Sequence, residues 1–411
     1  MSKVLAIICE YNPFHNGHLY QLTESIKAVS PDFVVCIMSG NFVERGNTAL
    51  INKWARTEMA LRSGVDMVVE LPTIYAISSA ENFAAGSIKI LDSLKCDTCL
   101  SFGSECGDVT TLSKFAKILL EEPPEYITML NHELSKGLSF PKARENAMLL
   151  YINNIRTSAN ILSGSNNILG IEYLKQIMKQ NTSISPFTIK RTGTEYNSLS
   201  TLNNMASSTA IREMLVQKKS IKNLVPKSAY SILKDELGNG RYVLDISKFE
   251  REIIYKLRCM SIEQIANLPD VTEGLEYKIK EAANACNTLD SLVFMVKSKR
   301  YTLTRINRIM LYALLDITKQ DYINSQKVTP YLRILGLSEN GKSLLSELSK
   351  NKKLNVVTSV KSFLEDGKNN NNSKILKSML QKDILATNIY TLGYTKNPAA
   401  NLDYTQKIIV V

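Results

Sequence analysis

Two histidines flank a glycine in the run His15-Asn16-Gly17-His18, and their types and spacing suit phosphate chemistry. At the start of a helix, imidazoles three residues apart share one face and could both donate hydrogen bonds to phosphate oxygens. Gly17 would let such a ligand approach bare backbone. Zinc is a poorer interpretation, because neither the spacing nor a neighbouring carboxylate or cysteine supplies a third ligand. The run therefore predicts a phosphate-binding pair of histidines.

The flanking residues predict the elements that would position this pair. The apolar run 4–8 is typical of a strand buried on both faces. The turn cluster Tyr11-Asn12-Pro13 would end that strand, and the apolar spacing from Leu19 to Val29 predicts an amphipathic helix. At the start of such a helix, backbone N–H groups are unsatisfied and the macrodipole adds roughly half a positive charge. Strand, turn and helix start together predict an anion site.

The rest of the first half alternates strands with helices. Strand patterns cover residues 32–38, 65–70, 98–102 and 185–191, and helix patterns cover 53–63, 79–91 and 168–178. This alternation predicts an α/β fold with a Rossmann-like, doubly wound parallel sheet. Ligands of such sheets bind outside the carboxyl ends of the strands. Glu10, Ser39-Gly40, Glu70 and the stretch 103–105 follow the strands, so we expect the site at that edge.

A second anion-binding helix start is predicted further along the chain. Ser207 and Ser208 open a helix pattern that carries Arg212, and Arg191 ends the fifth strand. Hydroxyls, backbone N–H groups and a guanidinium would together face an anion, such as the triphosphate of ATP and its departing pyrophosphate. An ordinary capped helix is the alternative. The polar residues 192–204 before it are expected to form a loop.

Composition limits the class of protein. The chain has 411 residues, 44% of them hydrophobic, and a formal net charge of +11, which suits an anionic partner such as nucleic acid. We expect two domains: 1–235, a nucleotide-binding catalytic domain, and 236–411, a mainly α-helical domain. No membrane span and no signal peptide are predicted, which leaves the cytoplasm. The 7 scattered cysteines fit reduced thiols there.

A basic stretch in the second half could contact RNA. Residues 297–308 carry basic side chains without an acid, and Tyr301 lies among them. Cations beside an aromatic ring are what an RNA backbone-and-stacking surface needs, although such a run is also typical of a solvated face. The candidate RNA-binding residues are Lys297, Lys299, Arg300, Arg305 and Arg308.

No resident metal site is predicted. Cys96 and Cys99, with Cys106 nearby, have no fourth ligand for structural zinc, and Cys99 lies in a strand pattern rather than at a helix start. No dedicated acidic cluster for Mg²⁺ is visible either, so whether Mg²⁺ accompanies ATP stays open.

Several motifs carry a resemblance to a known family. The run 15–18 resembles the signature of the HIGH-type nucleotidyltransferases, which act at the α-phosphate of ATP and release pyrophosphate. The chain is similar over most of its length to the tRNA(Met) cytidine acetate ligases, on the strings EYNPFHNGH, SGNFVERG, GVDMVVELP, FGSE, SNNILGIEY and SKRYTLTR. That similarity implies that acetate and ATP form acetyl-adenylate. It also implies that the acetyl group passes to the wobble cytidine of elongator tRNA(Met), giving N4-acetylcytidine.

The resemblance also implies a set of nucleotide-binding residues. His15 and His18 would be catalytic. The remaining ATP contacts would come from Ile7, Ile8, Cys9, Glu10, Tyr11, Asn12, Pro13, Phe14, Asn16, Gly17, Leu19 and Tyr20, with Gly103, Asn166 or Asn167, and Arg191. Tyr20 stands where the family pattern has a further histidine.

Two other functions are compatible with the residues alone. A cofactor adenylyltransferase acting on a phosphorylated small molecule would share the histidine pair, but it has no use for a basic helical domain. A non-catalytic RNA-binding protein would keep the basic stretch 297–308 and tolerate loss of both histidines.

Overall fold

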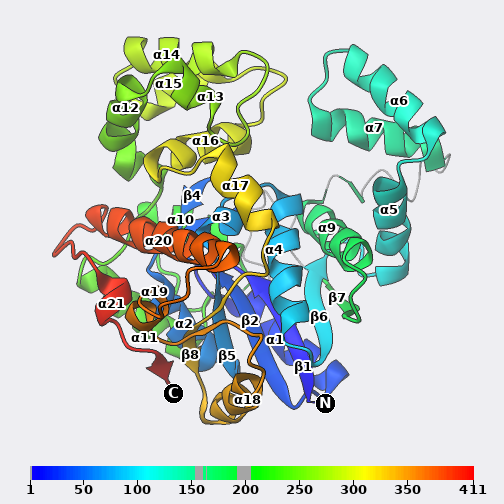
Figure 1. The fold of residues 1–411 in the computed structure, drawn as a ribbon. Helices are drawn as coiled ribbons and strands as arrows, with labels where there is room; N and C mark the ends of the chain where they lie inside the picture. Colours follow the sequence, from blue (N-terminus) through cyan, green and yellow to red (C-terminus); the bar gives the residue numbers. More distant parts are fainter. Residues whose placement is uncertain (1, 153–160, 163, 192–204) are drawn as a thin grey trace.

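The computed structural model describes residues 2–152, 161–162, 164–191 and 205–411. Its main sheet has the strand order β10-β8-β5-β2-β1-β6-β7 (Figure 1). The five strands predicted from the first half are present and parallel: β1 (Lys3–Cys9), β2 (Phe33–Ser39), β5 (Met67–Leu71), β6 (Asp97–Ser104) and β7 (Ser185–Lys190). The predicted doubly wound α/β sheet is therefore confirmed.

Strand β1 shows why both faces of the sheet are covered. Val4 and Ala6 belong to one buried cluster, which includes side chains of α4 (Ala80–Ser93) and α9 (Ser165–Lys179). Leu5 and Ile7 belong to the opposite cluster, which includes side chains of α1 (Asn16–Val29) and α2 (Lys53–Leu61). Because successive side chains point to opposite faces of a strand, a run that is apolar throughout requires a helical layer on each side.

The other helices of the first half cover the sheet or extend beyond it. They are α3 (Thr73–Ala76), α5 (Val109–Glu121), α6 (Pro124–Ser135), α7 (Phe140–Ile152), α10 (Ser208–Val216) and α11 (Lys227–Gly238). A short hairpin of β3 (Phe42–Val43) and β4 (Asn47–Thr48) follows β2. In Figure 1, α6 and α7 stand apart from the helices of the C-terminal half, beyond the same end of the sheet.

The C-terminal half is mainly helical. Its helical elements are η2 (Ile246–Phe249), α12 (Glu250–Cys259), α13 (Ile262–Ala266), α14 (Leu275–Ala285), α15 (Leu289–Val296), α16 (Leu303–Leu314), α17 (Lys319–Gln326), α18 (Glu339–Ser349), α19 (Val360–Leu364), α20 (Asn371–Leu392) and α21 (Leu402–Thr405). Among the described residues, no helix is long and apolar enough to cross a bilayer.

The sequence patterns missed one contribution of this half. Strand β8 (Leu332–Leu337) joins the main sheet antiparallel to β5, and β9 (Val356–Val357) and β10 (Ile409–Val410) pair parallel to β8. Residues after 331 therefore extend the sheet that the first half begins.

Buried charges join the two halves beside these strands. Lys53 Nζ lies 2.8 Å from Glu70 Oε1 and 2.7 Å from Asp403 Oδ1. Arg333 Nη1 lies 2.9 Å from Glu70 Oε2, and Nη2 donates to Asp403. All four side chains are buried. Because each charge in such a cluster compensates another, removal of one would leave an unpaired ion in the interior.

Candidate functional site

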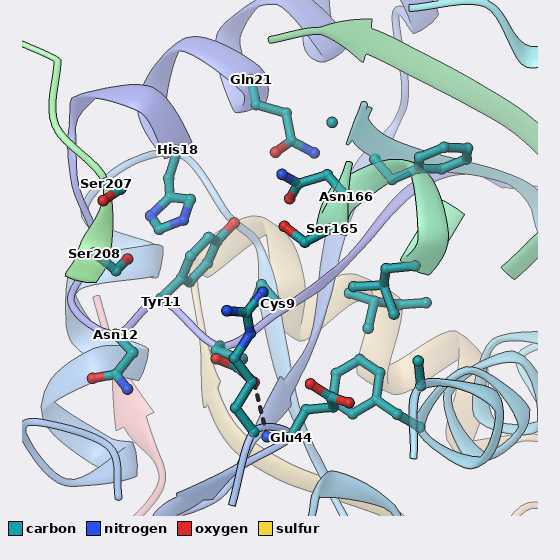
Figure 2. A pocket seen from close by; sticks show the side chains of 18 of the residues that line it. Cys9, Tyr11, Asn12, His18, Gln21, Glu44, Ser165, Asn166, Ser207 and Ser208 are labelled. Carbon is teal, nitrogen blue, oxygen red and sulfur yellow. Dashed lines mark hydrogen bonds between the residues drawn. The ribbon is translucent and has the colours of Figure 1, made fainter. Parts of the chain in front are cut away.

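A cavity of about 550 Å³ lies at the carboxyl ends of β1 and β6, where the sheet topology predicts a ligand (Figure 2). Most of the sequence-predicted nucleotide residues line it. They are Ile7, Ile8, Cys9, Glu10, Tyr11, Asn12, His15, His18, Gly103, Asn166, Arg191, Ser207, Ser208 and Arg212.

The loop from Glu10 to Phe14 is held in place by contacts with residues 48–50. The side-chain oxygen of Asn12 accepts a hydrogen bond from Leu50 N–H at 2.7 Å, and its amide donates to Thr48 O at 3.2 Å. Phe14 is fully buried, and its ring lies 4.7 Å from that of Tyr11 in an edge-to-face arrangement. The loop is thus packed and hydrogen-bonded before any ligand is bound, so the histidines that follow are preorganised.

Helix α1 begins at the histidine pair itself. Nδ1 of His15 accepts a hydrogen bond from Gly17 N–H at 3.1 Å, and Nδ1 of His18 accepts one from His15 N–H at 3.3 Å. The two rings stack with their centroids 3.6 Å apart. Since each Nδ1 accepts a backbone proton, the proton of each neutral ring is on Nε2. The pair therefore offers two Nε2–H donors fixed at the start of a helix.

Both imidazoles are neutral at physiological pH. Burial, and then the positive charge of Arg191, lowers the pKa of His15 to about 3. Burial, followed by His15 and Arg191, lowers the pKa of His18 well below its ordinary value. Neutral donors can stabilise charge that develops on a phosphate oxygen without first exchanging a proton with solvent.

Gly103, at the end of β6, lies between two long side chains. A Cβ placed on it would be 3.3 Å from Cγ of Arg191 and 3.7 Å from Oε1 of Gln21. The bare backbone of Gly103 thus leaves room for the side chain of Arg191, which lines the cavity. Arg191 begins the link to α10, where Ser207 caps the helix by accepting from Ala210 N–H at 3.2 Å.

The N-terminus of α9 forms another wall of the cavity. Glu105 accepts hydrogen bonds from the Asn166 side-chain amide at 2.7 Å and from Asn167 N–H at 2.8 Å. Asn166 lines the cavity. Asn167 is buried, and its side-chain oxygen accepts from Cys106 N–H at 3.0 Å. Of the two asparagines that the sequence leaves open, the structure places Asn166 at the cavity and Asn167 behind it.

Some predicted nucleotide residues lie elsewhere. Gly17 and Tyr20 line a small adjoining cavity of about 40 Å³, together with Gln21 and Arg191. The others outside the main cavity are Pro13, Phe14, Asn16, Leu19 and Asn167. His132, the third histidine of the chain, is an exposed residue of α6. The predicted loop 192–204 lies outside the described residues.

The sequence did not single out several residues that line the cavity. The polar ones are Gln21, Glu44, Arg45, Ser165, Tyr173, Thr209 and Thr304, and the apolar ones are Ala80, Phe83, Phe102, Ile168 and Leu169. Glu44 and Arg45 lie within SGNFVERG, which directly follows the second strand. Because this string follows the end of a predicted strand, its position could have indicated that Glu44 and Arg45 lie at the ligand-binding edge of the sheet.

Arg56 of α2 is a further residue that the sequence did not indicate. Its side chain is fully buried. Its Nε donates to Ile51 O at 3.1 Å, its Nη1 donates to Ser39 O at 3.1 Å, and its Nη2 donates to Gly40 O. The guanidinium thereby satisfies carbonyl groups at the end of β2, beside the cavity.

The basic stretch 297–308 divides into an exposed and a buried part. Lys297, Lys299 and Arg300 are exposed. Arg305 donates to Asp270 O at 2.7 Å and lies 5.0 Å from the ring centroid of Tyr301. The remaining residue of the set, Arg308, is buried and its Nε lies 3.0 Å from a carboxylate oxygen of Asp270. The freely accessible positive charge is thus concentrated at 297–300.

The cysteines form no disulfide bonds. All seven are free thiols, and among the residues that the structure covers no group of three His, Cys, Asp or Glu side chains is arranged to hold a metal. Burial raises the pKa of both Cys96 and Cys99, which keeps them as thiols.

A protein family and several known proteins match this chain over nearly its whole length. Residues 2–405 match the HIGH Nucleotidyl Transferase family. A tRNA(Met) cytidine acetate ligase of Caldanaerobacter subterraneus is 46% identical over 99% of both chains, and one of Acetivibrio thermocellus is 43% identical over 100% of both.

Solved structures agree with the sequence relatives. Crystal structures of Thermotoga maritima TmcAL, which is 34% identical, cover 100% of this chain and 99% of their own. The TM-score is 0.93 for an apo form and 0.90 for a form bound with alpha-thio ATP. With its strand–turn–helix histidine pair and full-length relatives, the chain belongs to the tRNA(Met) cytidine acetate ligase family of HIGH nucleotidyltransferases.

Proposed function

We propose that this protein is a cytoplasmic ATP-dependent ligase that joins acetate to the wobble cytidine of elongator tRNA(Met). In the first step a carboxylate oxygen of acetate attacks the α-phosphorus of ATP and pyrophosphate leaves, giving acetyl-adenylate. In the second step the exocyclic amine of the cytidine attacks the acetyl carbonyl carbon and AMP leaves. The product is N4-acetylcytidine.

The observation that carries this proposal is the neutral histidine pair at the start of α1. Two Nε2–H donors and the helix N-terminus face a cavity large enough for a nucleotide. Transfer at the α-phosphate needs in-line positioning and stabilisation of charge on the phosphate oxygens, which these groups supply. Arg191 and the hydroxyls at the start of α10 would hold the outer phosphates.

The proposed substrates have support of different kinds. ATP fits the family, and a solved relative is bound with alpha-thio ATP. The tRNA follows from the names of the relatives and from the exposed cations at 297–300. Acetate follows from the same names and the sequence motifs. Mg²⁺ would arrive with the phosphates of ATP, since the described residues offer no dedicated carboxylate cluster.

The experiment is exchange of labelled pyrophosphate into ATP, with and without acetate, followed by transfer of labelled acetate to an elongator tRNA(Met) transcript. Acetate-dependent exchange without tRNA, and label on the tRNA, are expected. His18→Ala should lower the exchange rate by about 10²–10³, the usual cost of losing one charge-stabilising donor. Turnover only with a phosphorylated small molecule, or no turnover, would contradict the proposal.

A further inference from the structure

Glu44 lies at the tip of the hairpin formed by β3 and β4. Gly46 N–H donates to Val43 O at 3.0 Å and closes the turn. Gly46 has a φ of +72°, and a Cβ on it would lie 2.5 Å from the backbone nitrogen of Arg308. The tip therefore packs directly on the backbone of α16, which fixes the position of Glu44 relative to the C-terminal helices.

Contacts on two sides hold Glu44 in the wall of the cavity. Its N–H donates to Oε1 of Glu10 at 3.0 Å, which ties it to the end of β1. Its own Oε1 lies 3.9 Å from Nη1 of Arg308, whose Nε is bound to Asp270. The side chain of Glu44 is nevertheless 23% exposed. The carboxylate is thus positioned by protein and still open to the cavity.

The cavity has two chemically different ends. Figure 2 shows His18, Ser207 and Ser208 on one side and Glu44 well away from them. The histidines and hydroxyls suit the phosphates of ATP, so the end at Glu44 remains for the second substrate. Thr304 also lines the cavity, and it follows the exposed cations at 297–300 by a few residues. A bound tRNA would therefore pass this end.

A second observation favours a polar ligand at the end of the cavity that holds Glu44, since this residue acts electrostatically on Tyr173. The hydroxyl of Tyr173, a residue of the cavity wall, is buried and makes no hydrogen bond within the described parts of the chain. A buried hydroxyl without a partner is costly, so a ligand atom that bonds to it would be favoured.

We propose that Glu44 accepts a hydrogen bond from the exocyclic amine of the acceptor cytidine and acts as the general base of acetyl transfer. This inference rests on the proposed function. A carboxylate matches the amine of cytosine, which is the donor on that base's pairing edge. As the amine nitrogen bonds to the acetyl carbon, the bond from that carbon to the AMP oxygen breaks and AMP leaves with the electron pair. The amine proton passes to Glu44.

The charge balance around Glu44 is suited to this role. Burial raises the pKa of Glu44 to about 7, and Glu10 and Asp270 raise it as well, whereas Arg308 and Arg45 lower it. A base whose pKa lies near the working pH combines a substantial ionised fraction with proton affinity.

The test separates the two half-reactions in the full-length protein. Acetate-dependent pyrophosphate exchange measures adenylate formation, and a single turnover with tRNA measures transfer. In Glu44→Gln the ratio of transfer rate to exchange rate should fall about 10²-fold or more, because general-base catalysis typically contributes that much. Glu44→Asp should recover part of the ratio. Glu58→Gln, which alters a half-buried carboxylate on α2 paired with Arg62, should leave both rates unchanged.

The pH profile provides a readout that a structural role would not alter. Transfer by the unsubstituted protein should rise with pH, reach half its maximum near pH 7 and level off above it, since Glu44 must lose its proton first. Glu44→Gln should lack this rise. An unchanged ratio in Glu44→Gln, or an equal loss in both half-reactions, would overturn the role of Glu44 alone. Absence of acetate-dependent exchange in the unsubstituted protein would overturn the proposed function itself.

Discussion

The guanidinium of Arg56 donates to the main-chain oxygen of Glu10 at 2.6 Å, across the boundary between α2 and the end of β1. With its bonds to residues 39, 40 and 51, one buried cation therefore holds the ends of two adjacent strands. Those ends carry both the histidine loop and the hairpin of Glu44. The site depends on this residue although Arg56 does not line the cavity.

Replacement of Arg56 by lysine should destabilise the protein. Lysine keeps the charge but cannot reproduce the planar fork that reaches several carbonyl groups, so buried acceptors lose their partners. We expect Arg56→Lys to lower the free energy of unfolding by about 2–4 kcal/mol, measured by urea denaturation. The same exchange at exposed Arg62 should change it by less than about 0.5 kcal/mol. Equal effects of the two variants would argue against the role of Arg56.

The buried state of His15 should make stability depend on pH. Its pKa in the folded protein, about 3, lies below the roughly 6.5 of an unfolded chain. The folded state therefore binds fewer protons, and the stability that His15 contributes is present above pH 6.5 and lost as the pH falls toward 3. His15→Asn, which keeps a helix cap but does not titrate, should lose less stability between pH 7 and 4.5.

Denaturation midpoints at the two pH values measure this difference. His132→Asn is the matched control, because His132 is exposed on α6, and it should retain the pH dependence of the unsubstituted protein. If His15→Asn retained it too, the imidazole of His15 would not be the group responsible.

A methyl group at Gly103 should weaken ATP binding. The added Cβ would lie 3.3 Å from Cγ of Arg191. This distance is shorter than most contacts that Cβ atoms make in proteins, so the arginine side chain would have to move. We expect Gly103→Ala to raise the KM for ATP about tenfold in the exchange assay, with a smaller change in kcat. Gly238→Ala adds a methyl group where no atom lies within 4 Å and should leave both constants unchanged. A purely kcat effect would contradict this account of Gly103.

Removal of exposed cations near the cavity should weaken tRNA binding selectively. Lys299→Ala with Arg300→Ala should lower tRNA affinity and reduce the steepness of log affinity against log salt by about 1–2. A protein that makes fewer phosphate contacts releases fewer counterions when it binds. Acetate-dependent exchange without tRNA should be unaffected. Lys352→Ala with Lys353→Ala removes two exposed charges after α18 and serves as the control. An unchanged salt slope in the first variant would exclude 297–300 as the tRNA surface.

The parts of the site that the sequence predicted correctly depend on local patterns. The apolar run at 4–8, the turn at 11–13 and the helix after His15 are each specified by neighbouring residues, so strand, loop and helix start could be placed together. The parallel orientation of β1, β2, β5 and β6 followed from the same alternation with helices.

The parts of the site and of the sheet that the sequence did not predict depend on contacts between residues that are distant in sequence. Glu44 reaches the cavity because a hairpin packs against α16, and β8 belongs to the sheet because β5 offers a free edge. No local pattern records either contact. The choice between Asn166 and Asn167 depended on the rotation of α9 about its axis, which Glu105 and Cys106 fix from another strand end. The boundary at 235/236 stays a prediction, since the sheet itself takes strands from both sides of it.

The charge cluster of Lys53, Glu70, Arg333 and Asp403 has a consequence for synthesis on the ribosome. Lys53 and Glu70 are close together in the sequence, whereas Asp403 is translated long after both of them. Until Asp403 is translated, Lys53 and Arg333 have only Glu70 as a carboxylate partner within this cluster, so the buried charges are incompletely compensated. Completion of the charge cluster beside this sheet therefore depends on a segment translated long after β5, and a chain stalled before residue 403 would be a natural substrate for chaperones and proteases.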